Sequence, residues 1–182
     1  MEVFRPDIEG LVVIQPKIFG DSRGCFLETY NQKKYREIGI DEDFVQDNQS
    51  VSEKGVLRGL HFQNPKGQGK LVSVVEGEVY DVAVDVRKDS ATFGKHFGLV
   101  LTAEKKNQFY IPPGFAHGFC VLSERAIFTY KCTEFYHPEH EHSLLWSDPD
   151  LGIEWPVENP EVSEKDLKGL RLNEFEKRFL PE

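Results

Sequence analysis

Residues 79–86 read VYDVAVDV, and this stretch decides the fold class because apolar and polar side chains alternate along it. Successive side chains of an extended strand point to opposite faces of the sheet. The even-numbered residues 80–86 therefore share one apolar face, while Asp81, Ala83 and Asp85 share the other. We predict a strand whose even-numbered face is core and whose odd-numbered face is polar.

The same pattern extends over most of the chain. Glycine and proline, 15 and 10 of the 182 residues, separate segments rich in Val, Phe, Tyr and Ile. Turn signals about every 8–12 residues are typical of an all-β sandwich or barrel. Glu76-Gly77 is predicted to form a tight hairpin between two strands. The predicted strands are Leu11–Ile14, Cys25–Tyr30, Phe44–Asn48, Val56–Phe62, Leu71–Glu76, Glu78–Arg87, His96–Leu101, Gln108–Ile111, Ala116–Leu122 and Ala126–Glu134.

Helix signals are few. Asn31 is a suitable N-cap for a helix over Gln32–Ile38, with Gly39 following its C-terminus. Residues 163–166, SEKD, resemble the start of a second short helix, and the prolines after Tyr136 predict a loop-like C-terminal part. Without a repeat, a low-complexity tract or a linker, we expect one all-β domain over residues 1–182, with a few short helices and a long C-terminal wrap.

The charge excludes some partners. The chain has 22 Lys and Arg against 31 Asp and Glu, a net charge of −9, which disfavours nucleic acid and anionic membranes. An anionic ligand would need a local basic cluster. No apolar run approaches the ~18 residues of a membrane span, and no basic-then-apolar leader begins the sequence, so we expect a cytoplasmic protein. Cys25, Cys120 and Cys132 have no Cys-x-x-Cys spacing and are expected to be reduced packing residues.

Two segments place polar groups where a buried strand would be apolar: RGLHFQ at 58–63 and PPGFAHGF at 112–119. In a regular strand Arg58 and His61 lie on opposite faces, so they can share one only through a bulge at Gly59. The alternative is that His61 is an ordinary core histidine. The second segment breaks at its prolines and delivers His117 at the start of a strand.

The spacing of PPGFAH resembles the second signature of the cupin superfamily of jelly-roll barrels. Metal-binding cupins carry His-x-His followed by Glu in the first signature. Here HFQ stands at 61–63, Gly67 and Gln68 stand where the Glu belongs, and Lys70 adds a cation nearby. We therefore predict no metal at this site. HPEHEH at 137–142 holds three imidazoles, but a solvated acidic loop is the favoured interpretation.

Six motifs occur in an order that extends the resemblance over nearly the whole chain. They are FVQDNQS (44–50), GVLRGLHFQ (55–63), GKLV (69–72), IPPGFAHGF (111–119), YKCTEFY (130–136) and SEKD (163–166). Together they resemble the dTDP-4-dehydrorhamnose 3,5-epimerase family. The resemblance implies a cupin-type jelly-roll barrel that epimerises dTDP-4-dehydro-6-deoxy-D-glucose at C3 and C5 in dTDP-L-rhamnose biosynthesis. It implies no cofactor and no metal. It also implies a homodimer whose N-terminal strands help to build the neighbour's site.

The resemblance further assigns roles to residues that match the motifs. His61 would be the base, Tyr130 the acid, Asp166 the carboxylate partner of His61, and Lys70 a cation near the C4 oxygen. Tyr136 would stack on thymine. Other substrate contacts would come from Arg23, Glu28, Gln46, Asp47, Asn48, Arg58, His117, Glu141 and Lys165.

The chemistry explains why such groups are needed. Removing a proton from C3 or C5 of a 4-keto sugar leaves an enolate with its charge on the C4 oxygen. A histidine held in one tautomer can take the proton, and a phenol on the opposite face can return one. One alternative is an enzyme that inverts a single centre. Another is a non-catalytic cupin that binds a nucleotide sugar, which would not need His61, Tyr130 and Asp166 together.

Overall fold

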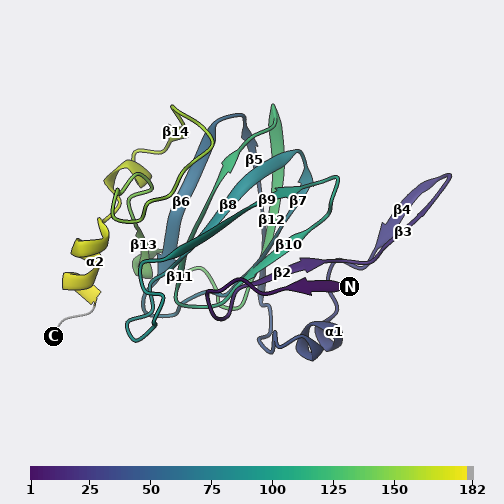
Figure 1. Ribbon diagram of the computed structural model, residues 1–182, viewed down its shortest axis with the longest axis horizontal. Helices are drawn as coiled ribbons and strands as arrows, with labels where there is room; N and C mark the ends of the chain where they lie inside the picture. The colour runs from purple at the N-terminus through teal and green to yellow at the C-terminus, as the bar shows by residue number, and fades with distance from the viewer. Residues whose placement is uncertain (180–182) are drawn as a thin grey trace.

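The computed structural model describes residues 1–179, which form two facing, mainly antiparallel sheets (Figure 1). The first sheet runs β1 (Glu2–Phe4), β2 (Val12–Gln15), β10 (Gln108–Ile111), β7 (Lys70–Glu76), β12 (Arg125–Cys132) and β5 (Gln46–Glu53). The second runs β13 (Glu141–Ser143), β6 (Val56–Gln63), β11 (Phe115–Val121), β8 (Glu78–Asp85) and β9 (His96–Thr102), with β14 (Glu161–Val162) parallel to β6. The predicted all-β jelly-roll barrel is confirmed.

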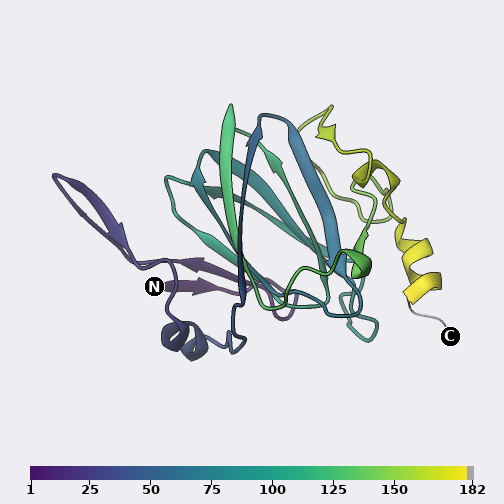
Figure 2. The same ribbon diagram turned by 180° about the vertical axis from the view of Figure 1, so that it is seen from behind.

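A hairpin and a helix lie at the N-terminal side of the barrel. The hairpin of β3 (Ile18–Asp21) and β4 (Gly24–Leu27) projects well away from the two sheets in both views (Figures 1 and 2). Helix α1 (Gln32–Glu37) follows it, and the Asn31 side chain accepts a hydrogen bond from the Lys34 amide as an N-cap. The predicted first helix is thus confirmed, and its Tyr35 is buried against the first sheet.

The structure corrects the predicted environment of the two faces of residues 79–86. Val79 and Ala83 belong to the cluster between the sheets, whereas Val82 and Val84 lie on the outer face, buried in a second cluster beneath the C-terminal segment. Asp81 faces the barrel interior and is fully buried. One face of β8 packs in the core between the sheets and the other packs beneath the C-terminal segment, so neither is a solvent face.

The predicted hairpin at Glu76-Gly77 is wrong. Strand β7 pairs with β10 and β12, and β8 pairs with β11 and β9, so Gly77 carries the chain from one sheet to the other. Gly77 has φ +81, and a Cβ there would lie 2.1 Å from the Arg125 carbonyl oxygen, which only glycine avoids. Two alternating segments joined by glycine have the same sequence pattern whether they pair or separate.

The C-terminal part is more structured than predicted. Within residues 136–179 it contains β13, β14, two short 3₁₀ turns (Pro138–His140 and Asp166–Lys168) and helix α2 (Leu172–Phe179). Phe175 of α2 packs edge-on against Phe62 of β6, with ring centroids 5.3 Å apart. The wrap thereby covers the outer face of the second sheet and brings the 3₁₀ turn at Asp166 beside β6. Among the described residues no helix is long and apolar enough to cross a membrane.

Strand β6 contains an irregularity that decides which side chains enter the barrel. His61 pairs with His117 and Arg58 with Phe119, so three steps along β6 match two along β11. This extra residue is a bulge at Gly59, the condition under which Arg58 and His61 can share a face, and φ there is +126. A Cβ there would lie 2.5 Å from the Gly118 Cα. Arg58 and His61 therefore both face the cavity described below.

The three cysteines are free. Cys120 and Cys132 are buried strand residues, as predicted. Cys25 is exposed on the projecting hairpin, so its predicted packing role within the chain is wrong. A short segment of alternating apolar and polar residues has the same sequence pattern whether its apolar face packs against the core of its own chain or is exposed.

One buried ion pair fixes the turn after β8. Burial opposes ionisation of Asp85, but hydrogen bonds from Arg87, Ser90 and Thr92 outweigh burial and hold its pKa at about 2. Because this pKa is lower than in the unfolded chain, the stabilisation, about 2 kcal/mol, is complete above pH ~4 and is lost as the pH falls through 2.

We expect Asp85→Asn to lower the free energy of unfolding at pH 7 by about 3 kcal/mol, because it leaves the Arg87 guanidinium without its carboxylate. Urea unfolding measures this change. Asp21→Asn is the matched control, since Asp21 and Arg23 form the same Asp-x-Arg pair on the exposed hairpin. The control should leave the unfolding midpoint unchanged. Equal effects of both substitutions would contradict the prediction.

Candidate active site

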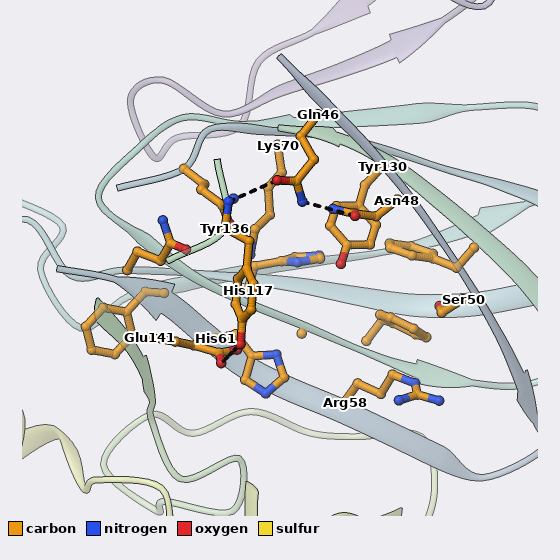
Figure 3. Close-up of a pocket in the computed structure, with 16 residues that line it drawn as sticks. Gln46, Asn48, Ser50, Arg58, His61, Lys70, His117, Tyr130, Tyr136 and Glu141 are labelled. Carbon is orange, nitrogen blue, oxygen red and sulfur yellow. Dashed lines mark hydrogen bonds between the residues drawn. The ribbon is translucent and has the colours of Figure 1, made fainter. Parts of the chain in front are cut away.

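A cavity of about 360 Å³ opens between the two sheets (Figure 3). Its wall combines amide, imidazole, ammonium, guanidinium and phenol groups with three phenylalanines. The lining residues are Gln46, Asn48, Ser50, Arg58, His61, Phe62, Gln63, Gln68, Lys70, His117, Gly118, Phe119, Phe128, Tyr130, Tyr136 and Glu141. Most of the residues predicted for the site therefore meet in one place.

His61 and Asp166 form a hydrogen-bonded pair at the cavity wall. The His61 Nε2 lies 2.6 Å from the Asp166 Oδ1, and the Gly59 amide donates to Asp166 Oδ2 at 3.2 Å. Burial alone would raise the pKa of Asp166, but these bonds hold it below its usual range. An ionised Asp166 accepts a hydrogen bond from the protonated Nε2 of His61. The unprotonated Nδ1 is then the basic nitrogen of the ring.

Tyr130 lies on the opposite wall. It belongs to β12 in the first sheet, whereas His61 belongs to β6 in the second. Burial raises the pKa of the Tyr130 phenol, and the nearby Glu141 carboxylate adds to this effect. The phenol is therefore protonated at neutral pH and available as a proton donor.

Lys70 places an ammonium in the cavity. It is 8% exposed, and burial lowers its pKa. Among residues 1–179 its Nζ has no hydrogen-bond or ion-pair partner, so the cation is available to a ligand oxygen. Such a group stabilises a negative charge that develops on an oxygen during a reaction.

A second imidazole–carboxylate pair was not predicted. The His117 Nε2 lies 3.0 and 2.9 Å from the two carboxylate oxygens of Asp81, and both side chains are buried. Burial lowers the pKa of His117, although Asp81 opposes this effect. The sequence signal was present, because an aspartate on the interior face of a buried strand requires a partner. The incorrect assignment of the faces of 79–86 concealed it.

The rim of the cavity is built by Tyr136, Glu141 and Lys165. The Tyr136 hydroxyl donates to Glu141 Oε2 at 2.6 Å, and Lys165 Nζ donates to the same oxygen. The hydrogen bond to Glu141 raises the pKa of Tyr136 to about 12. Tyr136 remains 50% exposed, so its ring is accessible at the mouth.

The site residues predicted from strand β5 lie on opposite faces of the strand. Gln46, Asn48 and Ser50 point into the cavity, whereas Asp47 lies on the opposite face and pairs with Lys131 at 2.9 Å. The Asp47 side chain therefore does not line this cavity, unlike those of Gln46 and Asn48. The reason is the two-residue period of a strand, which places adjacent side chains on opposite faces.

Arg23 and Glu28 lie outside this chain's own cavity. Arg23 is on the projecting hairpin and pairs with Asp21. Glu28 pairs with Lys34 at 2.8 Å at the start of α1. Both positions follow from the hairpin leaving the barrel (Figure 2).

Arg58 is oriented by a second serine of β5. Its Nε donates to the Ser52 hydroxyl at 3.0 Å. This bond occupies the Nε edge of the guanidinium, and Arg58 lines the cavity (Figure 3). Such a group can bind an anion through two parallel hydrogen bonds.

The histidine-rich segment after Tyr136 forms ion pairs of its own. The His137 ring lies 3.7 Å from a Glu134 oxygen and 3.5 Å from a Glu139 oxygen. Within the described part of the chain no group of three or more His, Cys, Asp or Glu side chains is arranged to hold a metal ion.

Comparison with known proteins places this site in a family. A sequence model described as dTDP-4-dehydrorhamnose 3,5-epimerase matches residues 5–174. The chain belongs to the dTDP-4-dehydrorhamnose 3,5-epimerase family. The predicted resemblance is thereby confirmed, and the jelly-roll barrel is the fold of the family's solved members.

Three members of this epimerase family illustrate the range of sequence identity to this chain. The dTDP-4-dehydrorhamnose 3,5-epimerase of Shigella flexneri is 56% identical over 94% of this chain and 96% of its own. A Legionella pneumophila 3,5-epimerase solved with dTDP-4-keto-L-rhamnose is 54% identical, with TM-score 0.92 over 94% of this chain and 93% of its own. ChmJ from Streptomyces bikiniensis, a 3'-monoepimerase solved with dTDP-quinovose, is 36% identical, with TM-score 0.89 over 94% and 88%.

Proposed function

We propose that the protein epimerises dTDP-4-dehydro-6-deoxy-D-glucose at C3 and C5, giving dTDP-4-dehydro-L-rhamnose for dTDP-L-rhamnose biosynthesis. The observation that carries the proposal is the His61–Asp166 pair on one wall of a cavity with Tyr130 on the other. Inversion at carbon needs a base and an acid on opposite faces of the sugar. Sequence relatives named as this enzyme at up to 56% identity support the substrate class.

In this mechanism His61 Nδ1 removes the proton from the carbon next to the C4 ketone, and Asp166 stabilises the imidazolium through Nε2. The electron pair moves to the C4 oxygen, where the Lys70 ammonium stabilises the enolate. Tyr130 then donates its proton to the opposite face of the same carbon. The imidazolium of His61 next loses its proton to solvent and the Tyr130 phenolate takes one from solvent, so the same four groups can serve the second centre. We propose this chemistry without a cofactor or a metal.

We propose that the nucleotide lies toward the rim, with thymine against Tyr136 and the diphosphate near Arg58. His117, Gln46, Asn48, Glu141 and Lys165 would complete the contacts. The projecting hairpin suits a homodimer of this single-domain chain, in which Arg23 and Glu28 of one copy reach the cavity of the other. Exposed Phe19 and Phe26 on that hairpin, 53% and 69% exposed, support an interface there.

A single-centre epimerase is the second candidate, because ChmJ shares the fold and 36% of the sequence. Proton NMR of the keto sugar incubated with the protein in D₂O separates the two. Deuterium uptake and inversion at both C3 and C5 are expected. Inversion at one carbon alone would establish the second candidate, and binding without any exchange would identify a nucleotide-sugar-binding protein instead of an enzyme.

Asp166→Asn is expected to lower kcat by about 10²-fold, while the affinity for dTDP changes little. The amide cannot stabilise the imidazolium, and the side chain of residue 166 bonds to His61 and to the Gly59 amide, neither of which is a proposed nucleotide contact. Steady-state kinetics and calorimetric titration with dTDP measure the two effects. Asp47→Asn is the matched control, since this carboxylate pairs with Lys131 outside the cavity. Weaker dTDP binding with unchanged kcat would assign Asp166 to binding.

A further inference from the structure

We propose that Gln63 is a positioning residue that fixes Tyr136 for nucleotide binding, an inference that rests on the proposed function. Gln63 stands where the metal-binding cupins described above carry their second histidine. It follows His61 by two residues on β6, so the two side chains lie on the same face of the strand. An amide has a donor and an acceptor, and this side chain, 7% exposed, uses both.

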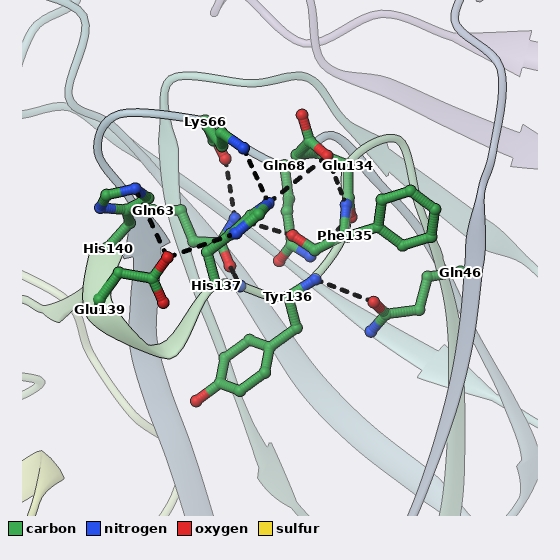
Figure 4. Close-up of polar contacts among 10 residues, drawn as sticks. All are labelled: Gln46, Gln63, Lys66, Gln68, Glu134, Phe135, Tyr136, His137, Glu139 and His140. Atoms are coloured by element: carbon green, nitrogen blue, oxygen red, sulfur yellow. Dashed lines mark hydrogen bonds and ion pairs between the residues drawn. The ribbon is translucent and has the colours of Figure 1, made fainter.

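The contacts of Gln63 surround Tyr136 (Figure 4). Its Nε2 donates to the carbonyl oxygens of Phe135 at 3.2 Å and Lys66 at 2.8 Å. Its Oε1 accepts from the His137 amide at 2.8 Å. The residues immediately before and after Tyr136 are therefore both bonded to one buried side chain.

Two further glutamines extend this arrangement. Gln46 Oε1 accepts from the Tyr136 amide at 2.9 Å, and Gln68 Nε2 donates to the Glu134 carbonyl at 2.8 Å. Each residue of the segment 134–137 thus has a backbone group bonded to a glutamine side chain. We refer to Gln46, Gln63 and Gln68 as the glutamine clamp. They come from β5, β6 and the loop before β7, so the clamp joins the rim to both sheets.

The glutamine clamp explains how the half-exposed ring of Tyr136 is fixed in position. Gln46 holds the Tyr136 backbone, and the Tyr136 hydroxyl donates to Glu141 at 2.6 Å, so the side chain is fixed at both ends. A ring that is already ordered loses less conformational entropy when a base stacks on it. Gln63 and His61 lie on the same face of β6. This one strand therefore positions both Tyr136, against which the thymine would stack, and the proposed catalytic base.

Calorimetric titration with dTDP tests the proposal. Gln63→Met keeps the length of the side chain but removes the amide. It is expected to weaken dTDP binding about tenfold and to raise KM similarly, while kcat stays within about threefold, because His61 and Tyr130 are untouched. Gln15→Met is the matched control, since Gln15 makes the same kind of bond, to the Lys105 carbonyl at 2.7 Å, outside the cavity. The control should bind dTDP like the wild type.

A double variant decides whether Gln63 acts through Tyr136. If it does, Gln63→Met combined with Tyr136→Ala binds dTDP no more weakly than Tyr136→Ala alone. Losses that multiply, or an unchanged affinity in Gln63→Met, would overturn the proposal. If Gln63→Met does not fold, Gln68→Met replaces it in the same cycle, with a smaller loss expected. Product formation by the wild type, followed separately, shows whether the proposed function itself fails.

Discussion

Replacing His61 with alanine is expected to abolish deuterium uptake at C3 and C5 together, because one base is proposed for both carbons. General base catalysis commonly contributes about 10²–10⁴-fold, so product formation should fall at least to that extent. The variant leaves Asp166 without its imidazole partner but keeps the Gly59 bond to its second oxygen. Proton NMR in D₂O follows both carbons in one sample.

His96→Ala is the matched control for this experiment. Its Nδ1 lies 3.0 Å from the Leu151 carbonyl oxygen, outside the cavity, so activity should be retained. Exchange at C3 that continues at the wild-type rate in His61→Ala would show that a second base exists. In that event His117, the other imidazole lining the cavity, is the residue to test next.

Tyr130→Phe is expected to separate proton exchange from inversion. The substitution keeps the ring and its packing against Phe128 but removes the hydroxyl. His61 can still take and return a proton on its own face, so exchange with retained configuration should fall less than inversion. Net product formation should drop about 10²–10⁴-fold, the usual contribution of a general acid.

One NMR experiment in D₂O again measures both rates. Tyr80→Phe is the matched control, because Tyr80 packs on the outer face of β8 against Trp155. That variant should exchange and invert like the wild type. If Tyr130→Phe loses exchange and inversion to the same degree as His61→Ala, or loses neither, Tyr130 is not the opposite-face acid.

The fold and the local part of the site were predictable, because both depend on short-range pattern. Turn residues and alternation placed most of the barrel strands, and the Asn31 cap placed α1. The opposite faces of Arg58 and His61 on a regular strand identified Gly59 as the place where a bulge would bring the two side chains together. Each of these inferences uses residues within a few positions of one another, where backbone geometry leaves few choices.

The errors arose where distant parts of the chain decide the outcome. No local pattern shows that β8 is covered on its outer side by residues near 175, so Asp81 was assigned to a polar surface. Asp166 lies 105 positions from His61 in the sequence, and only the family resemblance paired them. For Asp47 the two-residue period of a strand is sufficient, since it places this side chain on the face opposite Gln46 and Asn48.

The bulge at Gly59 limits how this strand can change over evolutionary time. On either side of it, a substitution alters one surface only. A deletion or insertion within 56–63 would instead exchange two surfaces at once, turning Leu60 into the cavity and His61 and Gln63 toward the C-terminal helix. Catalytic chemistry and the seating of the last helix therefore depend on the same residue count.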